Sequence, residues 1–256
     1  MPLLEIENLT IFFGGLRAVH DYHLKINLGQ VFGLIGPNGA GKSTIFNLIT
    51  GIHKPTEGKI VFNGKSIIGL PPYEIASMGI GRTFQNMRLW RHMTVLEHIK
   101  LACYSKLNYG LIGAFFGTPK RQHEEAESER KAYLLMDLMG IRRFDDQVVT
   151  NLPYGIQRRV EIARALAIEP KLLLLDEPTA GMNPEELSDL VGIIRKIRQE
   201  FELAIFLIEH RMKFVMDLCE RIQTLDFGEV IAEGTPEEIR NNPRVIDAYL
   251  GREAEI

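Results

Sequence analysis

A short glycine-rich segment constrains the fold of this chain more than any other feature. Residues 36–44 read Gly36-Pro37-Asn38-Gly39-Ala40-Gly41-Lys42-Ser43-Thr44. They match the pattern of a Gly, four variable residues and Gly-Lys-Ser, which is typical of loops that bind phosphate. An apolar run over residues 31–35 predicts a strand before the loop, and residues 45–50 predict a helix after it that ends at Gly51. Strand, glycine loop and helix in this order predict an α/β fold.

The residue types in this loop have specific chemical uses. Glycines let the backbone adopt positive φ and approach a phosphate group closely. Consecutive N–H groups and the N-terminus of the following helix then point toward the anion. We expect Lys42 to reach the β- and γ-phosphates of a nucleotide and the Ser43 hydroxyl to bind Mg²⁺. The alternative is a glycine-rich turn that binds nothing, and both the spacing and the flanking elements weigh against it.

The composition narrows the class of protein. The chain has 256 residues, of which 45% are hydrophobic and 25% charged, as is ordinary for a globular protein. Its net charge of −3 weighs against a dedicated nucleic-acid binder. Cys103 and Cys219 have no metal or redox spacing. We see no signal-peptide pattern and no apolar run near the roughly 18–20 residues that span a bilayer, so we expect a cytoplasmic chain.

The periodicity of apolar residues predicts an α/β pattern that a helical block interrupts. Before the block, the patterns favour strands over residues 4–9, 22–26 and 59–64, a helix over 72–78 and an extended segment over 81–85. The third strand is expected to end in a hairpin turn at Asn63-Gly64. After about residue 86, three helices are expected, over 94–107, 118–140 and 154–168, and residues 94–97 predict a capping box at the start of the first. A glycine-rich loop separates the first two of these helices.

The α/β pattern resumes after the helical block. Residues 172–175 are four leucines, as expected of a parallel strand that is buried on both faces. A capped helix is predicted from Asn183 to about residue 199, a strand over 203–208 and a helix over 212–219. Two strands within 221–233 and two short helices, over 236–240 and 244–250, are expected to complete the chain.

Polar residues follow the predicted strands where ligands bind in open α/β sheets. Asp176 and Glu177 come directly after the four leucines. Asp176 is expected to hold Mg²⁺ through water, and Glu177 to orient or deprotonate the attacking water. His210 would contact the γ-phosphate, and Gln85 would contact Mg²⁺ or the water. Taken alone, the histidine and the glutamine have plain interpretations as strand-end surface residues, and the phosphate loop in the same chain favours the functional interpretation.

The order of these motifs resembles that of the nucleotide-binding subunits of ATP-binding cassette (ABC) transporters. The phosphate loop, Gln85, a signature segment, the carboxylate strand and His210 follow one another as in that family. The signature segment comprises Leu152, Pro153, Tyr154, Gly155 and Ile156. The resemblance implies a phosphate-loop NTPase with a mixed, largely parallel core sheet, an antiparallel β subdomain and an inserted helical subdomain. It implies a single ABC ATPase domain over 1–256, with the core and β subdomain in 1–86 and 169–256 and the helical subdomain in about 87–168.

Further stretches are similar to one branch of this family, the LivG-type ATP-binding proteins of branched-chain amino-acid importers. They are residues 82–90, a glycine-rich insertion over 107–119, residues 234–239 and residues 242–251. By position alone, an aromatic residue just before the phosphate loop is either a stacking partner for adenine or a core residue at a strand end. Residues 13–19 are similar to the family's aromatic loop, which implies that Phe13 stacks on adenine.

The resemblance also implies partners and cofactors. This family acts as a dimer that binds ATP and Mg²⁺, and each ATP lies between the phosphate loop of one chain and the signature of the other. Closure of the dimer moves two transmembrane permease subunits, and hydrolysis to ADP and phosphate resets it. A solute-binding protein is an indirect partner, and the chain is expected on the inner face of the cell membrane. Four alternatives stay open: transport of urea, export of lipopolysaccharide, a non-transport ABC switch, and a regulatory subunit that binds ATP without hydrolysing it.

The signature departs from the family's usual Leu-Ser-Gly-Gly-Gln. Pro153 replaces Ser, Tyr154 replaces the first Gly and Ile156 replaces Gln. The N–H groups of Tyr154, Gly155 and Ile156 are still expected to face the partner's γ-phosphate. We therefore expect a heterodimer whose partner ATPase has an intact signature, with the weaker site where this chain's signature is used; a homodimer stays open. Asn183 stands where the family usually has Asp, and its role as a helix cap suffices to explain it.

Overall fold

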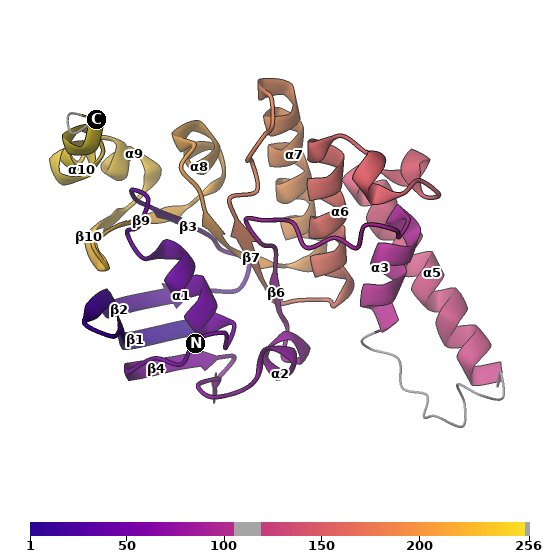
Figure 1. The fold of residues 1–256 in the computed structure, drawn as a ribbon, viewed down its shortest axis with the longest axis horizontal. Coiled ribbons are helices and arrows are strands. Elements are labelled where there is room, and N and C mark those ends of the chain that lie inside the picture. The colour runs from indigo at the N-terminus through magenta and orange to yellow at the C-terminus, as the bar shows by residue number, and fades with distance from the viewer. Residues whose placement is uncertain (105–118, 254–256) are drawn as a thin grey trace.

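The fold is described from a computed structural model, which covers residues 1–104 and 119–253. The elements form three layers (Figure 1): a small antiparallel sheet with the helices that share its core, a central sheet, and a group of helices on the other side. The α/β prediction, with its mixed core sheet and separate antiparallel sheet, is confirmed. We expected a glycine-rich insertion over residues 107–119. Its residues 107–118 lie outside the described residues.

The central sheet has six strands in the order β10-β9-β3-β8-β7-β6. The strands are β3 (Val31–Ile35), β6 (Ile80–Arg82), β7 (Leu172–Asp176), β8 (Ala204–Ile208), β9 (Arg221–Asp226) and β10 (Glu229–Gly234). All neighbouring pairs are parallel except β9 and β10. The carboxyl ends of β3 and β7 therefore meet at one edge, where the phosphate loop and Glu177 follow them.

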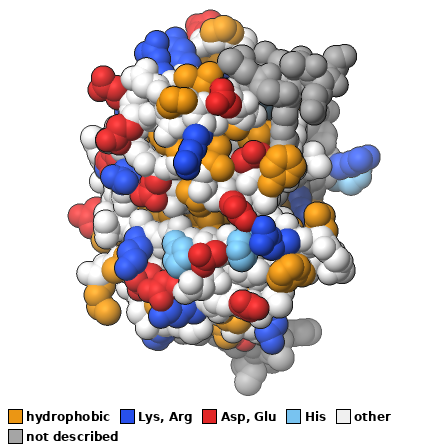
Figure 2. All heavy atoms as spheres, turned by 90° about the vertical axis from the view of Figure 1, so that its left-hand side faces the viewer, with side chains coloured by type: hydrophobic (Ala, Val, Ile, Leu, Met, Phe, Trp, Pro, Cys, Tyr) orange, Lys and Arg blue, Asp and Glu red, His pale blue; other side chains and the backbone are white. Residues whose placement is uncertain are grey.

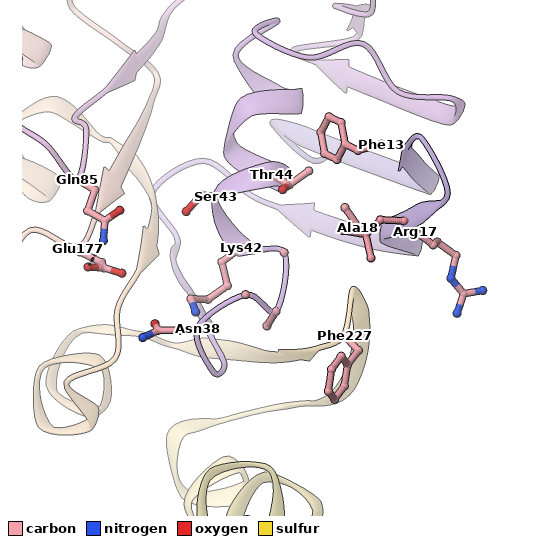
Figure 3. A pocket seen from close by; sticks show the side chains of 14 residues that line it. Phe13, Arg17, Ala18, Asn38, Lys42, Ser43, Thr44, Gln85, Glu177 and Phe227 are labelled. Carbon is pink, nitrogen blue, oxygen red and sulfur yellow. Dashed lines mark hydrogen bonds between the residues drawn. The ribbon is translucent and has the colours of Figure 1, made fainter. Parts of the chain in front are cut away.

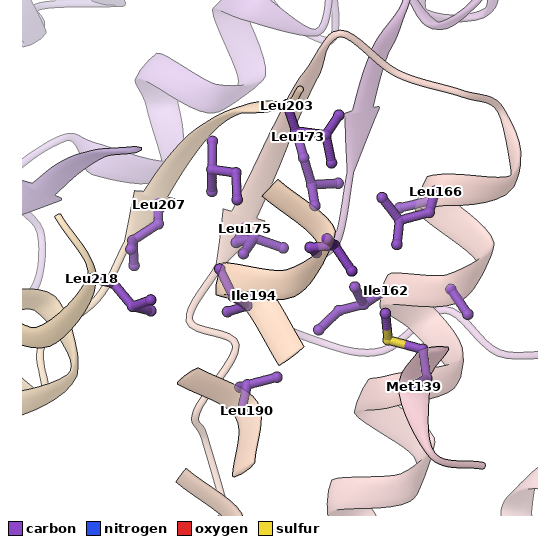
Figure 4. Packing of buried hydrophobic residues seen from close by; sticks show 14 of the residues in the cluster. Met139, Ile162, Leu166, Leu173, Leu175, Leu190, Ile194, Leu203, Leu207 and Leu218 are labelled. Carbon is purple, nitrogen blue, oxygen red and sulfur yellow. The ribbon is translucent and has the colours of Figure 1, made fainter. Parts of the chain in front are cut away.

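Alternate residues of the central strands enter two different hydrophobic cores. Leu173 and Leu175 pack among the helices (Figure 4), whereas Leu172 and Leu174 pack toward the antiparallel sheet. Successive side chains of a strand point to opposite faces, so a strand between two layers needs an unbroken apolar run. Each fully buried leucine contributes about 1.5–3 kcal/mol to stability. The four leucines thus hold the carboxylates that follow them in a rigid frame.

The second sheet has the strand order β2-β1-β4-β5 and is antiparallel. Its strands are β1 (Leu4–Phe13), β2 (Leu16–Ile26), β4 (Glu57–Phe62) and β5 (Lys65–Ser66). β1 and β2 are longer than predicted because they pair as a hairpin beyond the alternating residues, and register shifts near Leu9 and Ile11 disturb the alternation. The predicted Asn63-Gly64 turn between β4 and β5 is confirmed, with φ of 47° and 77°.

The helices agree with the predicted segments to within a few residues. They are α1 (Lys42–Ile49), α2 (Pro72–Ser77), α3 (Val95–Cys103), α5 (Pro119–Met139), α6 (Tyr154–Ala167), α7 (Pro184–Phe201), α8 (Met212–Leu218), α9 (Pro236–Arg240) and α10 (Pro243–Glu253). Thr94 and Asn183 form the predicted capping boxes of α3 and α7. α3 ends four residues earlier than predicted. Within the described ranges, no helix is both long and apolar enough to cross a membrane.

Different helices lie at the two ends of the molecule. Figure 1 shows α3, α5 and α6 together at one end and α9 and α10 at the other, beside β9 and β10. Figure 2 views the second end, where acidic and basic side chains are interspersed with hydrophobic ones. Ion pairs bridge strands here, including Arg17 with Glu229 and Arg221 with Glu233. Such exposed pairs contribute only about 0–1 kcal/mol each, so the interior packing holds the elements together.

Candidate functional site

The predicted phosphate loop borders a cavity of about 640 Å³. Figure 3 shows Gln85 and Glu177 on one side of the loop, and Phe13, Ala18 and Phe227 on the other. The loop between them would meet the phosphates of a ligand that reaches from the aromatic side to the carboxylate side. The lining residues are Phe13, Leu16, Arg17, Ala18, Asn38, Gly39, Ala40, Gly41, Lys42, Ser43, Thr44, Gln85, Glu177 and Phe227.

All three glycines of the loop have positive φ, and at two of them a side chain would also collide with neighbouring backbone. Gly36 has a φ of 146°, and a Cβ there would lie 2.1 Å from the Leu225 carbonyl oxygen. Gly41, the N-cap of α1, has a φ of 106°, and a Cβ there would lie 2.6 Å from the Ala18 carbonyl oxygen. No side chain caps the first turn of α1. Its N–H groups are therefore left to bind an anion at the positive end of the helix.

Lys42 lies against the backbone of the loop. Its side chain is buried, and Nζ donates hydrogen bonds to the carbonyl oxygens of Gly36 (2.7 Å) and Pro37 (2.8 Å). Gly36 and Pro37 do not themselves line the cavity, so their part in the site is to hold this ammonium group. Ser43, the next residue, is exposed toward the cavity.

Glu177, Gln85 and His210 are brought together as predicted. The Gln85 Nε2 donates a 2.9 Å hydrogen bond to Glu177 Oε2, and His210 Nδ1 lies 4.0 Å from the same oxygen. Glu177 has a φ of 45°, a conformation that is unusual for a non-glycine residue and that clusters at functional sites. Two side chains from two separate segments thus converge on the Glu177 carboxylate at the edge of the cavity.

Asp176 forms an ion pair that we did not predict from the sequence. It is buried, and Oδ2 accepts a 3.0 Å hydrogen bond from Arg82 in an ion pair. Burial raises the pKa of Asp176, and Arg82 opposes that rise. Its other oxygen, Oδ1, is buried and has no hydrogen-bond partner among the described residues. A free buried carboxylate oxygen and the exposed Ser43 hydroxyl fit a hard divalent cation, which prefers oxygen ligands.

The signature residues lie away from this cavity. Pro153 is the N-cap of α6, and Tyr154 is partly exposed beside Gly181, where a Cβ would lie 3.1 Å from the Tyr154 ring. One expectation was wrong, because the Ile156 N–H is already used: it donates to the Pro153 carbonyl oxygen at 3.0 Å. Of the three N–H groups that we assigned to an anion, those of Tyr154 and Gly155 therefore remain candidates.

A buried ion pair that we did not predict connects the signature helix to the segment containing Gln85. Arg158 and Glu161 of α6 are fully buried and lie 2.6 Å apart. Arg158 donates to the carbonyl oxygens of Phe84 and Gln85, and Glu161 accepts a hydrogen bond from the Phe84 N–H. The only sequence signal was a pair of charges three residues apart on the otherwise apolar face of a helix. This pair fixes the backbone from which Gln85 reaches Glu177.

Phe13 is not buried, which excludes the interpretation that it is a core residue at a strand end. It lies at the end of β1, its exposed fraction is 43%, and it lines the cavity. Its ring contacts His53 edge-on at 5.1 Å. Phe227, which we did not predict, lies in the turn between β9 and β10 and is 73% exposed at the same cavity. Turn residues of this kind carry no periodic signal in a sequence.

The fold and this cavity define a nucleotide-binding protein of the phosphate-loop class. The sequence matches the family model of ABC transporters over residues 19–180. It also matches the model of branched-chain amino acid ATP-binding cassette transporters over residues 229–255. The chain belongs to the family of ABC transporter ATP-binding cassettes, whose members bind nucleotide.

Curated relatives match the chain over nearly its whole length. It is 45% identical to the high-affinity branched-chain amino acid transport ATP-binding protein BraF of Pseudomonas aeruginosa, with 98% of each chain covered. It is 44% identical to LivG of Escherichia coli, again with 98% of each covered. It is 36% identical to the lipopolysaccharide export system ATP-binding protein LptB of Haemophilus influenzae, with 99% of each covered.

Solved structures of ATP-binding cassettes share the fold. The ADP conformation of one cassette from an ABC transporter is 31% identical, covers 98% of this chain and 99% of its own, and gives a TM-score of 0.85. A dimeric post-hydrolysis state of another cassette, bound to ADP and phosphate, is 26% identical, covers 91% and 98%, and gives 0.77. The expected cassette fold is therefore confirmed.

Proposed function

We propose that this chain is the ATP-hydrolysing subunit of an importer of branched-chain amino acids. The observation that carries hydrolysis is the convergence of Gln85 and His210 on Glu177 beside the phosphate loop. Support for the cargo comes from the relatives BraF and LivG and from the match of the C-terminal segment. A subunit that binds ATP without hydrolysing it would not need this arrangement.

In this proposal, each part of the cavity binds one part of ATP. Phe13 stacks on adenine, and the loop from Gly36 to Thr44 surrounds the phosphates, with the N–H groups of residues 41–44 directed toward them. Lys42 stays hydrogen-bonded to the loop and turns its charge toward the β- and γ-phosphates. Ser43 and Gln85, with Asp176 through water, would hold Mg²⁺, which would neutralise charge on the phosphate oxygens. Because the Gln85 nitrogen is engaged with Glu177, its carbonyl oxygen is the atom available to the cation.

Glu177 and His210 act on the water. Glu177 orients the attacking water and accepts its proton, and Gln85 holds the carboxylate in position. His210 contacts the γ-phosphate and keeps the water in line. The positive φ of Glu177 directs its side chain away from the strand and toward the cavity.

We further propose that the chain works as one half of a dimer. The solved dimer of a related cassette supports association of two such chains. This chain's signature, Leu152 to Ile156, faces the ATP of the partner, with the N–H groups of Tyr154 and Gly155 toward the γ-phosphate. Because Pro153 lacks a hydroxyl and Tyr154 is bulky, we propose a heterodimer whose partner supplies an intact signature. The site in the partner is then the slower one.

The remaining partners follow from the same proposal. Two transmembrane permeases dock on the chain at the inner face of the cell membrane, and a solute-binding protein delivers the amino acid to them. The helical subdomain, residues 87–168, moves with the permeases, while the core and β subdomain, residues 1–86 and 169–256, hold ATP. Lipopolysaccharide export is the second candidate, because LptB is 36% identical over 99% of the chain.

The cargo is tested by reconstituting this chain in liposomes with the membrane subunits that co-purify with it. We expect ATP-dependent uptake of labelled leucine, isoleucine or valine, and loss of uptake in the Glu177→Gln variant. Hydrolysis stimulated by lipopolysaccharide instead of by amino acid would contradict the import proposal.

The proposed difference between the two ATP sites of the heterodimer has its own test, in which the catalytic Glu of each ATPase subunit is replaced in turn. Equal losses of activity from the two replacements would refute it.

A further inference from the structure

The C-terminal helix touches the phosphate loop directly. Tyr249 of α10 lies 213 positions after Gly36, yet the Gly36 N–H donates a 2.9 Å hydrogen bond to its phenolic oxygen. Figure 1 shows α10 beside β9 and β10, at the end of the molecule opposite the helical block. None of the functions assigned above uses this contact.

Gly36 is the residue of the loop with the most restricted surroundings. Its φ of 146° and its close approach to the Leu225 carbonyl exclude every side chain. Its N–H is held by Tyr249, and its carbonyl oxygen accepts the hydrogen bond from Lys42 Nζ. The phenol of α10 and the phosphate-binding ammonium therefore hold the two ends of one residue.

Tyr249 is held in place by apolar packing, so its hydroxyl has a defined position. Its ring packs against the hydrophobic core that contains the helices. Burial raises the pKa of the Tyr249 phenol further above neutral pH, and its oxygen accepts the hydrogen bond from the Gly36 N–H. The ring also borders a cavity of about 680 Å³ between α8, α9 and α10, which is lined by Met212, Met216, Val245 and Ile246 among others. One side of the ring is thus not tightly packed.

We propose that Tyr249 is a positioning residue for the nucleotide site. Its hydroxyl holds Gly36 in the conformation that directs Lys42 and the loop N–H groups at the phosphates. The position of α10 therefore sets the affinity for ATP, without any contact between α10 and the nucleotide. This role lies outside the hydrolytic and transport steps, and it does not depend on the cargo.

The test is Tyr249→Phe in the full chain, which removes one oxygen atom and keeps the ring. We expect the Kd of a fluorescent ATP analogue, and the KM for ATP in the assembled ATPase, to rise about 5- to 30-fold. That factor equals about 1–2 kcal/mol at 1.4 kcal/mol per decade, as expected for a lost partner of a buried N–H. We expect kcat at saturating ATP to stay within about twofold of wild type. The melting temperature should fall by only about 2–8 °C, as a loss of this size implies for a chain of this length.

A matched control and a local measurement separate positioning from general packing. Tyr73→Phe removes an equivalent hydroxyl from a tyrosine of α2 that is 73% exposed and does not line the cavity at the loop, so ATP affinity should not change. Hydrogen exchange in a peptide that spans Gly36 should become faster in Tyr249→Phe and stay unchanged in Tyr73→Phe. Wild-type ATP affinity in Tyr249→Phe, or a loss of kcat at unchanged KM, would overturn the proposal.

Discussion

Glu161 offers the sharpest test of how the site is supported. Its carboxylate is fully buried against Arg158 and accepts the Phe84 N–H. Glu161→Leu keeps a similar volume but leaves the Arg158 guanidinium buried without its counter-charge. Removing one partner of a buried ion pair costs about 3–5 kcal/mol, which is a large part of the roughly 5–15 kcal/mol that holds a typical protein folded.

The expected effect is large enough for an equilibrium experiment. At a slope of about 3 kcal/mol per molar urea, the loss moves the unfolding midpoint down by about 1–1.7 M. Far-ultraviolet circular dichroism in urea measures it. Lys196→Ala, which breaks an exposed pair with Glu200 on α7, is the control and should cost less than about 1 kcal/mol.

A double variant separates stability from catalysis. In Arg158→Leu/Glu161→Leu no charge stays buried, so the free energy of unfolding should recover part of the loss caused by Glu161→Leu alone. Hydrolysis should stay low, because the Phe84 and Gln85 backbone has lost the hydrogen bonds that position Gln85. The reasoning is refuted if Glu161→Leu unfolds within about 1 kcal/mol of wild type, or if the double variant is less stable than the single one.

Three further predictions test the cavity and the interior. Phe13→Ala should raise the Kd for ATP several-fold through lost stacking, whereas Phe12→Ala, an equally exposed neighbour that does not line the cavity, should leave it unchanged; equilibrium binding decides. Lys42→Ala should reduce ATP binding below detection in the same titration, and the exposed Lys54→Ala should not. Burial raises the pKa of the Cys219 thiol, so iodoacetamide at pH 8 should modify it only after unfolding, as mass spectrometry would show; rapid labelling of the native chain would contradict its buried position.

The parts of the fold that local patterns specify were predictable from the sequence. The phosphate loop, the strand of four leucines and the capping boxes at Thr94 and Asn183 each lie within a few consecutive residues, and each was found where expected. The ends of β1 and β2 were not predicted, because pairing between the strands, and not alternation, extends them.

Contacts between distant segments account for what the sequence did not predict. The Tyr249–Gly36 hydrogen bond joins residues 213 positions apart, and the Arg82–Asp176 pair joins residues 94 apart. Neither leaves a local pattern, since each depends on which strands and helices become neighbours. The Ile156 N–H was misassigned for a related reason: the first turn of α6 tightens onto the Pro153 carbonyl, a detail of backbone geometry that residue types do not specify.

The central claim is that this chain hydrolyses ATP as part of a heteromeric membrane importer. The most direct measurement isolates tagged Glu177→Gln chain with ATP from gently solubilised native membranes and identifies the co-purifying chains by mass spectrometry. We predict two different polytopic permeases and a second ATPase with an intact Leu-Ser-Gly-Gly signature, all retained more strongly with ATP than without it. A self-paired chain with other membrane partners, or soluble partners alone, would contradict the account.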